Sequence, residues 1–168
     1  DKLVSIYEPK KTTYATVEYL DYLGITSGDT AQNAKVFKLL KDADAIVHVV
    51  RAFEDASVIH PTKSVDPLRD VSSFEDELIL GDLEFVEKRL EKIEAQEKKG
   101  KKPETGDKGL LLKCKAALED EISLRDVEFN DEEKRQMLPY QLLTTMQEII
   151  VLNINESDIN SDKAKDIR

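Results

Sequence analysis

Apolar residues gather in three short runs along the chain, at residues 16–20, 45–50 and 148–152. The first is rich in β-branched and aromatic side chains, and the second is almost continuously apolar, as expected for a strand covered on both faces of a parallel sheet. Residues 31–40, between these two runs, are predicted to form a helix. The apolar side of that helix is predicted to consist of Ala34, Phe37, Leu39 and Leu40. The order strand, helix, strand predicts an α/β fold with a parallel sheet.

A different periodicity begins after the second run. From Ile79 onward, apolar residues recur in steps of four and three, which is the seam of a coiled coil over about two heptads. The residues of this seam are Ile79, Leu83, Val86, Leu90 and Ile93. A break rich in Lys, Gly and Pro follows at residues 98–107.

A second helical run follows the break, with Leu111, Cys114, Leu118 and Ile122 on one side. Two helices joined by a short polar break predict an antiparallel hairpin. The tip of this hairpin would carry Lys98, Lys99, Lys101 and Lys102. After the hairpin, Asn130 is predicted to begin another helix, and Pro139 is predicted to end it.

Composition narrows the class of protein. The chain has 168 residues, 40% hydrophobic and 36% charged, which is typical of a soluble globular protein with a polar surface. No apolar run approaches the roughly 20 residues that span a bilayer, so no membrane contact is expected. The single cysteine, Cys114, excludes an internal disulfide and favours a reducing, cytoplasmic location. It lies among helix-spaced apolar residues, so we expect it to be a packing residue.

The charge is unevenly distributed. The chain has a net charge of −10, but residues 88–115 contain ten Lys or Arg against five Asp or Glu. A mostly acidic body would repel a nucleic-acid backbone. The basic hairpin tip has two interpretations, as a local contact for RNA or as a solvated turn.

Asp21 and Gly24 form a DxxG motif directly after the first predicted strand. A carboxylate at the carboxyl end of a parallel strand is well placed to hold Mg²⁺ through water, and the glycine lets a backbone N–H approach a terminal phosphate. The motif is short, and an ordinary turn after a strand would produce it by chance.

Asn153 and Glu156 follow the third predicted strand in the same way and form an NxxE motif. An Asn at this edge can bind a purine ring, and a carboxylate can accept hydrogen bonds from ring nitrogens or an exocyclic amine. Guanine-reading domains use NKxD, and neither its Lys nor its Asp is present here. The alternative is a loop of solvated polar residues.

Taken together, DxxG, an intervening strand and an Asn-led motif follow the order used by Ras-like nucleotide domains. Residues 44–70, 77–90 and 153–156 then give a pattern that resembles the YchF/Obg-like ATPase family. The resemblance implies a partial Ras-like P-loop NTPase sheet at residues 1–72 and 141–168, with an antiparallel helical coiled-coil insertion at residues 73–140. It also implies ATP binding and hydrolysis in preference to GTP, Mg²⁺ as cofactor, and association with ribosomes.

The resemblance also assigns roles to two further positions. Ile25 matches a hydrophobic residue that the family has where Ras-like enzymes place a water-orienting Gln, and His60 matches the histidine proposed to replace it. An imidazole can orient water as an acceptor or act as a weak base near neutral pH. Without the family, His60 reads as a surface histidine, and Arg51, Asp66 and Arg69 are predicted to form a structural ion-pair network.

Two departures from the family limit these expectations. Residues 24–33 lack the glycine-rich stretch that the family has after DxxG, and the chain contains no GxxxxGK[ST] phosphate loop. We therefore expect the isolated chain to bind no ATP and to self-associate through an unpaired sheet edge. The alternative function is a degenerate interaction module that binds a partner through its hairpin.

Overall fold

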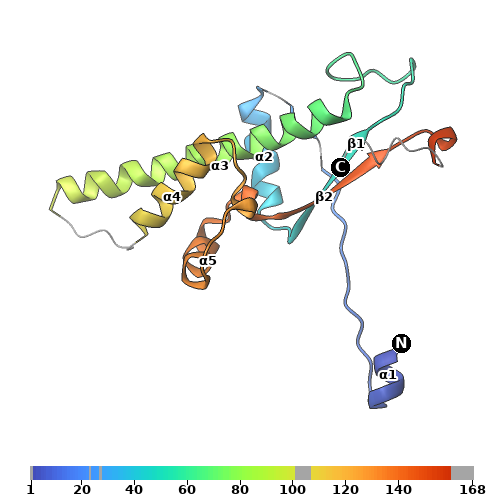
Figure 1. The fold of residues 1–168 in the computed structure, drawn as a ribbon, viewed down its shortest axis with the longest axis horizontal. Helices are drawn as coiled ribbons and strands as arrows, with labels where there is room; N and C mark the ends of the chain where they lie inside the picture. Colours follow the sequence, from blue (N-terminus) through green and yellow to red (C-terminus); the bar gives the residue numbers. More distant parts are fainter. Residues whose placement is uncertain (1, 23, 27, 101–106, 160–168) are drawn as a thin grey trace.

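The computed structural model describes residues 2–22, 24–26, 28–100 and 107–159 (Figure 1). The helices are α1 (Lys2–Tyr7), α2 (Thr30–Leu40), α3 (Pro67–Lys98), α4 (Lys108–Glu119) and α5 (Asp131–Met137). The strands are β1 (Ala45–Arg51) and β2 (Gln147–Asn153). Short 3₁₀ turns are η1 (Leu124–Asp126), η2 (Leu138–Tyr140), η3 (Leu143–Thr145) and η4 (Glu156–Asp158). No helix in the described ranges is long and apolar enough to cross a membrane.

The sheet consists of β1 and β2, which pair in parallel from Ala45 opposite Gln147 to Arg51 opposite Asn153. Alternate side chains of a strand point to opposite faces. Ile46 and Val50 are therefore buried on one face, whereas Val47 and Val49 are exposed on the other. The mixed α/β class and the parallel pairing of these two predicted strands are confirmed.

The strand predicted at residues 16–20 does not form. These residues are exposed and irregular, and the chain from residue 8 to residue 22 runs away from the body towards α1 (Figure 1). The side chains of Val17, Tyr19 and Leu20 are 69%, 82% and 54% exposed. β-propensity stabilises a strand only where a neighbouring strand and an apolar surface meet it. No ladder partner reaches this segment within the part of the chain that the structure describes.

Helix α2 forms close to the predicted range, and Phe37 and Leu40 of its predicted apolar side do face the core. The side chains that point inward are Asn33, Val36, Phe37 and Leu40. Ala34 and Leu39, which were predicted to be on the apolar side, are exposed. The ring of Phe37 lies on Gly81 of α3, where an added Cβ would come within 2.8 Å of the ring. This close approach of the two helices excludes a larger residue at position 81 unless the ring moves.

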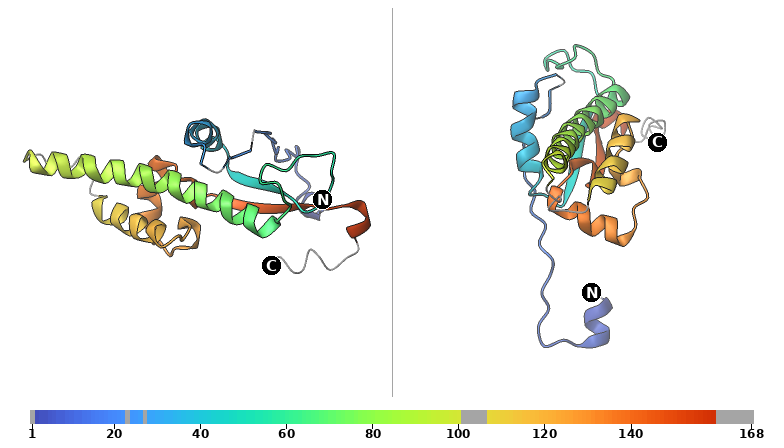
Figure 2. Two further views of the ribbon diagram at one scale, coloured as in Figure 1. Left: turned by 90° about the horizontal axis from the view of Figure 1, so that it is seen from above. Right: turned by 90° about the vertical axis from the view of Figure 1, so that its left-hand side faces the viewer.

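Helices α3 and α4 lie side by side and run in opposite directions (Figures 1 and 2). Helix α3 begins with the Asp66 side chain accepting a hydrogen bond from the N–H of Arg69 at 3.1 Å. Most of the predicted seam is buried against α4, with Leu83 partly buried. The facing residues of α4, Leu111, Cys114 and Leu118, are buried as well.

The predicted face of the second helix ends earlier than expected. Helix α4 stops at Glu119, and Glu121 has a φ of +58°, a left-handed conformation that ends the helical path. Ile122 therefore lies outside the helix and is 44% exposed. Cys114 is confirmed as a packing residue, and its burial raises the pKa of the thiol to about 11.

A buried carboxylate joins α3 to the segment that leads into β2. Asp82 is 2% exposed and accepts hydrogen bonds from the N–H of Leu143 at 3.0 Å and the N–H of Thr144 at 2.7 Å. It also accepts one from the hydroxyl of Thr144 at 2.7 Å. Burial raises the pKa of Asp82, and these hydrogen bonds oppose that effect. The contact therefore joins α3 to η3, the turn just before β2.

A capping box begins α5, as the sequence predicts, and Pro139 lies just after its end. Asn130 accepts from the N–H groups of Glu132 and Glu133, and the Glu133 carboxylate accepts from the N–H of Asn130 at 2.8 Å. We expect Asn130→Ala to lower the free energy of unfolding by about 1 kcal/mol, because orphan N–H groups at the helix start lose their acceptor. Urea unfolding checks this, with Asn130→Asp as the control that keeps the cap. An equal loss in both variants would contradict the capping role.

Candidate functional site

The carboxyl ends of β1 and β2 lie next to each other and carry polar residues. Arg51 ends β1 opposite Asn153 of β2, and the N–H of Ala52 donates to the carbonyl of Asn153 at 2.7 Å. Glu156 follows as the exposed first residue of η4. Of the predicted NxxE motif, Asn153 is therefore the last residue of β2, and Glu156 lies three residues beyond the strand.

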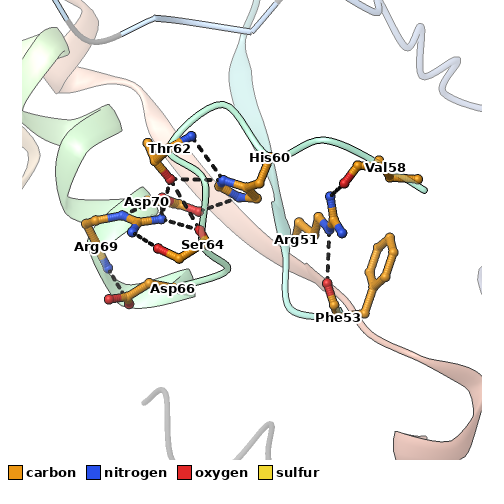
Figure 3. A network of polar contacts seen from close by, with 9 residues as sticks. All are labelled: Arg51, Phe53, Val58, His60, Thr62, Ser64, Asp66, Arg69 and Asp70. Carbon is orange, nitrogen blue, oxygen red and sulfur yellow. Dashed lines mark hydrogen bonds and ion pairs between the residues drawn. The ribbon is translucent and has the colours of Figure 1, made fainter. Parts of the chain in front are cut away.

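The loop between β1 and α3 leaves the same edge and is organised by Arg51. Its guanidinium donates to the carbonyl oxygens of Phe53 at 2.9 Å, Val58 at 2.9 Å and Asp55 at 3.2 Å. The side chain of Arg51 also lies over the Phe53 ring. Figure 3 shows the contacts of Arg51 with Phe53 and Val58 beside those of His60. The half-buried guanidinium of Arg51 therefore holds a loop that contains no helix or strand.

His60 lies in this loop with both ring nitrogens occupied (Figure 3). Its Nδ1 accepts from the N–H of Thr62 at 3.3 Å and contacts the Thr62 hydroxyl at 2.9 Å. Its Nε2 lies 3.1 Å from a carboxylate oxygen of Asp70 on α3. Because the backbone N–H can only donate, this arrangement assigns the proton of the neutral ring to Nε2. The imidazole can meet an incoming water at Nδ1 only after it releases Thr62.

Arg69 supports the same carboxylate from the other side. It donates to the second oxygen of Asp70 at 3.0 and 2.8 Å, and to the hydroxyl and carbonyl of Ser64. Asp66 caps α3, and Arg51 binds backbone carbonyls. The ion-pair network expected between Arg51, Asp66 and Arg69 is therefore wrong, because Arg69 takes its neighbour Asp70 as partner and the other two bind backbone.

The structure places Asp21 and Gly24 differently from the sequence expectation. Asp21 is exposed and follows an irregular segment instead of a strand. Gly24 is exposed, and its carbonyl accepts from the side-chain amide of Gln32 at 3.4 Å. Among the described residues, no hydrogen bond or ion pair joins either residue to Asn153 or Glu156. No three His, Cys, Asp or Glu side chains in that part of the chain gather as a metal site, so the Mg²⁺ role of Asp21 stays a prediction.

Sequence reasoning missed a polar pair that holds the loop after Gly24. Asn33 on α2 and Glu77 on α3 are 1% and 8% exposed and bind each other at 2.7 Å. Glu77 also accepts from the N–H of Gly28, and Asn33 accepts from the N–H of Thr26. The available signal was a glutamate directly before apolar positions of the seam, where a surface acid is not expected.

A half-buried polar network joins the two strands to α3. His48 of β1 contacts Glu148 of β2 at 3.1 Å, and Arg125 bridges Glu148 to Glu75 of α3. The hydrogen bond from His48 lowers the pKa of Glu148, whereas burial raises the pKa of Glu75. His48 also stacks on Phe74 at 4.1 Å between ring centroids. These contacts agree with a satisfied strand histidine.

An open cavity of about 820 Å³ lies beside this network. Its lining includes Arg125, Phe129, Asn130 and Glu133. It includes none of Asp21, Gly24, His60, Asn153 and Glu156. The predicted site residues lie instead on loops and at a strand end.

Comparison with known proteins adds a relationship over nearly the whole chain, although no family model matches it. The ribosome-binding ATPase YchF of Bacillus subtilis is 35% identical over 161 residues, which cover 94% of this chain and 44% of that protein. Obg-like ATPase 1 of Oryza sativa subsp. japonica is 33% identical over 174 residues, covering 98% of this chain and 43% of that protein. The chain thus spans less than half the length of these curated relatives.

A solved structure supports the same relationship. The YchF GTPase of Schizosaccharomyces pombe superposes with a TM-score of 0.64 and 32% identity, over 80% of this chain and 37% of that one. The agreement in sequence extends across the strand pair and the helices between the strands. By fold and by sequence, this chain belongs to the YchF/Obg-like ATPase family.

Proposed function

We propose that this chain is part of a protein that binds and hydrolyses ATP with Mg²⁺ and associates with ribosomes in the cytoplasm. The observation that carries the proposal is the 35% identity to a ribosome-binding ATPase over 94% of the chain. Asn153 ends β2 and Glu156 follows it, where a base-reading loop would lie, which supports ATP as the substrate. GTP is the competing nucleotide.

Each predicted residue takes a role in this proposal. Asp21 holds Mg²⁺ through water, and the N–H of Gly24 meets the terminal phosphate. Asn153 and Glu156 bind the base. His60 orients the attacking water, for which its position on a loop at the carboxyl edge of the sheet is support.

The proposal includes a finer description of the fold. Residues 1–72 and 141–168 are part of a Ras-like P-loop NTPase sheet, and residues 73–140 are an inserted antiparallel coiled-coil hairpin. The buried face that α3 and α4 share supports the hairpin. Lys98 and Lys99, at the end of α3, are candidate ribosome or RNA contacts. Lys101 and Lys102 lie outside the described residues.

The direct test is nucleotide turnover by the longer protein that contains this sequence. Phosphate release is measured with ATP and with GTP, with and without Mg²⁺, and binding to ribosomes is measured by co-sedimentation. Turnover of ATP that exceeds turnover of GTP and requires Mg²⁺ supports the proposal. Absence of turnover with either nucleotide would overturn it.

The isolated 168-residue chain is expected to bind no ATP. Most of the attraction for a triphosphate comes from the N–H groups, the Lys and the Ser or Thr of a phosphate loop, and no GxxxxGK[ST] occurs in this sequence. Isothermal titration calorimetry with Mg²⁺-ATP at sub-millimolar concentration should give no binding heat. Tight binding would contradict the account of the site. We also expect the isolated chain to self-associate, because Val47 and Val49 are exposed on one face of the sheet.

The second candidate is an interaction module without hydrolysis. The observation in its favour is the stretch of residues 24–33, which departs from the glycine-rich pattern of the family. In that case the longer protein would bind a partner through α3 and α4 and would not release phosphate. The turnover experiment separates the two functions.

A further inference from the structure

Helix α3 carries a buried glutamate that reaches back to the loop before α2. We call residues 24–26 and 28–29 the Gly24 loop. One oxygen of Glu77 accepts from the N–H of Gly28 at 2.9 Å, and the other accepts from the side-chain amide of Asn33 at 2.7 Å. Glu77 is only 8% exposed, so water cannot solvate its carboxylate as it would at the surface. The carboxylate depends on these two protein donors instead. The buried carboxylate thus binds both the loop and the helix that follows it.

Asn33 completes the connection from the other side. Its side-chain oxygen accepts from the N–H of Thr26 at 3.0 Å, and its amide nitrogen donates to the carbonyl of Thr26 at 2.9 Å as well as to Glu77. The amide can satisfy these partners in one orientation only, because a flip would place donor against donor and acceptor against acceptor. Asn33 thus ties Thr26 and Glu77 together.

The spacing along α3 relates this contact to His60. Asp70, the partner of His60, lies seven residues before Glu77 on the same helix. Residues seven apart lie on the same side of a helix, separated by about two turns or roughly 10 Å. The Gly24 loop and the His60 ring are therefore both held by one face of one continuous helix.

We propose that Asn33 and Glu77 are positioning residues that hold the Gly24 loop on α3 and so set its place relative to His60. The inference rests on the proposed function, because it concerns the loop whose N–H would meet the terminal phosphate. It adds to that function a pair of buried residues. The pair acts through the backbone of the loop.

The variants follow from the donor and acceptor pattern. Glu77→Gln keeps the shape but replaces one oxygen by an NH2 group, which must face either the Asn33 amide or the N–H of Gly28, donor against donor. Asn33→Asp removes the donor and places a second carboxylate beside Glu77. The double variant, Asn33→Asp with Glu77→Gln, restores a donor and an acceptor between positions 33 and 77. The carbonyl of Thr26 still loses the donor that Asn33 supplied. Glu91→Gln, at an exposed position of α3, is the matched control.

Hydrogen exchange on the 168-residue chain tests the contact without any nucleotide. In Glu77→Gln we expect the amide of Gly28 to exchange about ten- to a hundredfold faster, because it loses a charged acceptor. The amides of β1 report global opening and should keep their rates. The double variant should recover part of the protection, and the control should match wild type. Unchanged exchange at Gly28, or an equal increase in β1, would overturn the contact as the device that holds the loop.

Turnover by the longer protein tests the positioning role. We expect Glu77→Gln to lower kcat about tenfold while leaving nucleotide affinity near wild type, with partial recovery in the double variant. Loss of affinity without loss of kcat, or no change in either, would overturn the role. Absence of turnover in wild type would refute the proposed function and the positioning role with it. The exchange experiment would still decide whether the pair holds the loop.

Discussion

Asp82→Ala is expected to lower the free energy of unfolding of the chain by about 3–5 kcal/mol. The carboxylate is 2% exposed and accepts the N–H groups of Leu143 and Thr144 together with the Thr144 hydroxyl. Removal of the acceptor leaves two backbone donors buried and unsatisfied, and it leaves a cavity beside α3. Domains of this size are stable by roughly 5–15 kcal/mol, so the loss is a large fraction of the total.

Urea unfolding followed by circular dichroism measures this loss. Asp76→Ala is the matched control, because Asp76 is exposed on the same helix. Asp82→Asn should give an intermediate loss, since its oxygen still accepts from one N–H group while its amide faces the other. A loss below about 1 kcal/mol for Asp82→Ala would show that water or a rearranged turn satisfies the two donors instead.

His60→Ala is expected to lower kcat for ATP hydrolysis by the longer protein about 100-fold or more, with nucleotide affinity close to wild type. The reason is that the imidazole would orient the attacking water and would contribute little to binding of the nucleotide. In the structure this ring is held between Thr62 and Asp70, which places it on the loop that leaves the carboxyl edge of the sheet. Single-turnover rates and nucleotide titration measure the two quantities separately.

Asp70→Asn distinguishes a role of His60 in activating water from a role in holding the loop. It keeps His60 but weakens the contact at Nε2, and it also weakens the support from Arg69. If His60 only pins the loop, both variants should alter affinity and kcat by similar factors. If His60 acts on water, kcat should fall much further in His60→Ala than in Asp70→Asn. An unchanged kcat in His60→Ala would remove this residue from the mechanism.

Elements defined by neighbours in the chain were predictable. The apolar run at residues 45–50 and the run at residues 148–152 became β1 and β2, and the order of the runs agreed with parallel pairing. The seam that starts at Ile79 became the buried face of α3 because its spacing matches the helix period wherever the helix packs. The helix start at Asn130 was predictable because the capping box involves only residues 130–133.

Predictions that required a distant partner were less successful. Residues 16–20 have strand composition but no neighbouring strand in the described structure, so Asp21 does not follow a strand as expected. Arg69 was expected to join a network with Arg51, and it binds Asp70 instead. The buried side of α2 includes the polar Asn33, whose partner Glu77 lies 44 residues away.

The sequence by itself determined β1, β2 and their parallel pairing, the seam of α3, the family and the chemical types of residue at the ends of these two strands. It could do so because periodicity, turns and caps are local interactions that act wherever the segment lies. The tertiary structure alone decided which buried polar groups meet, as for Asp82 with Thr144 and Glu77 with Gly28. A carboxylate removed from water must find donors, and only the packing of α3 against distant segments brings those donors within hydrogen-bond distance.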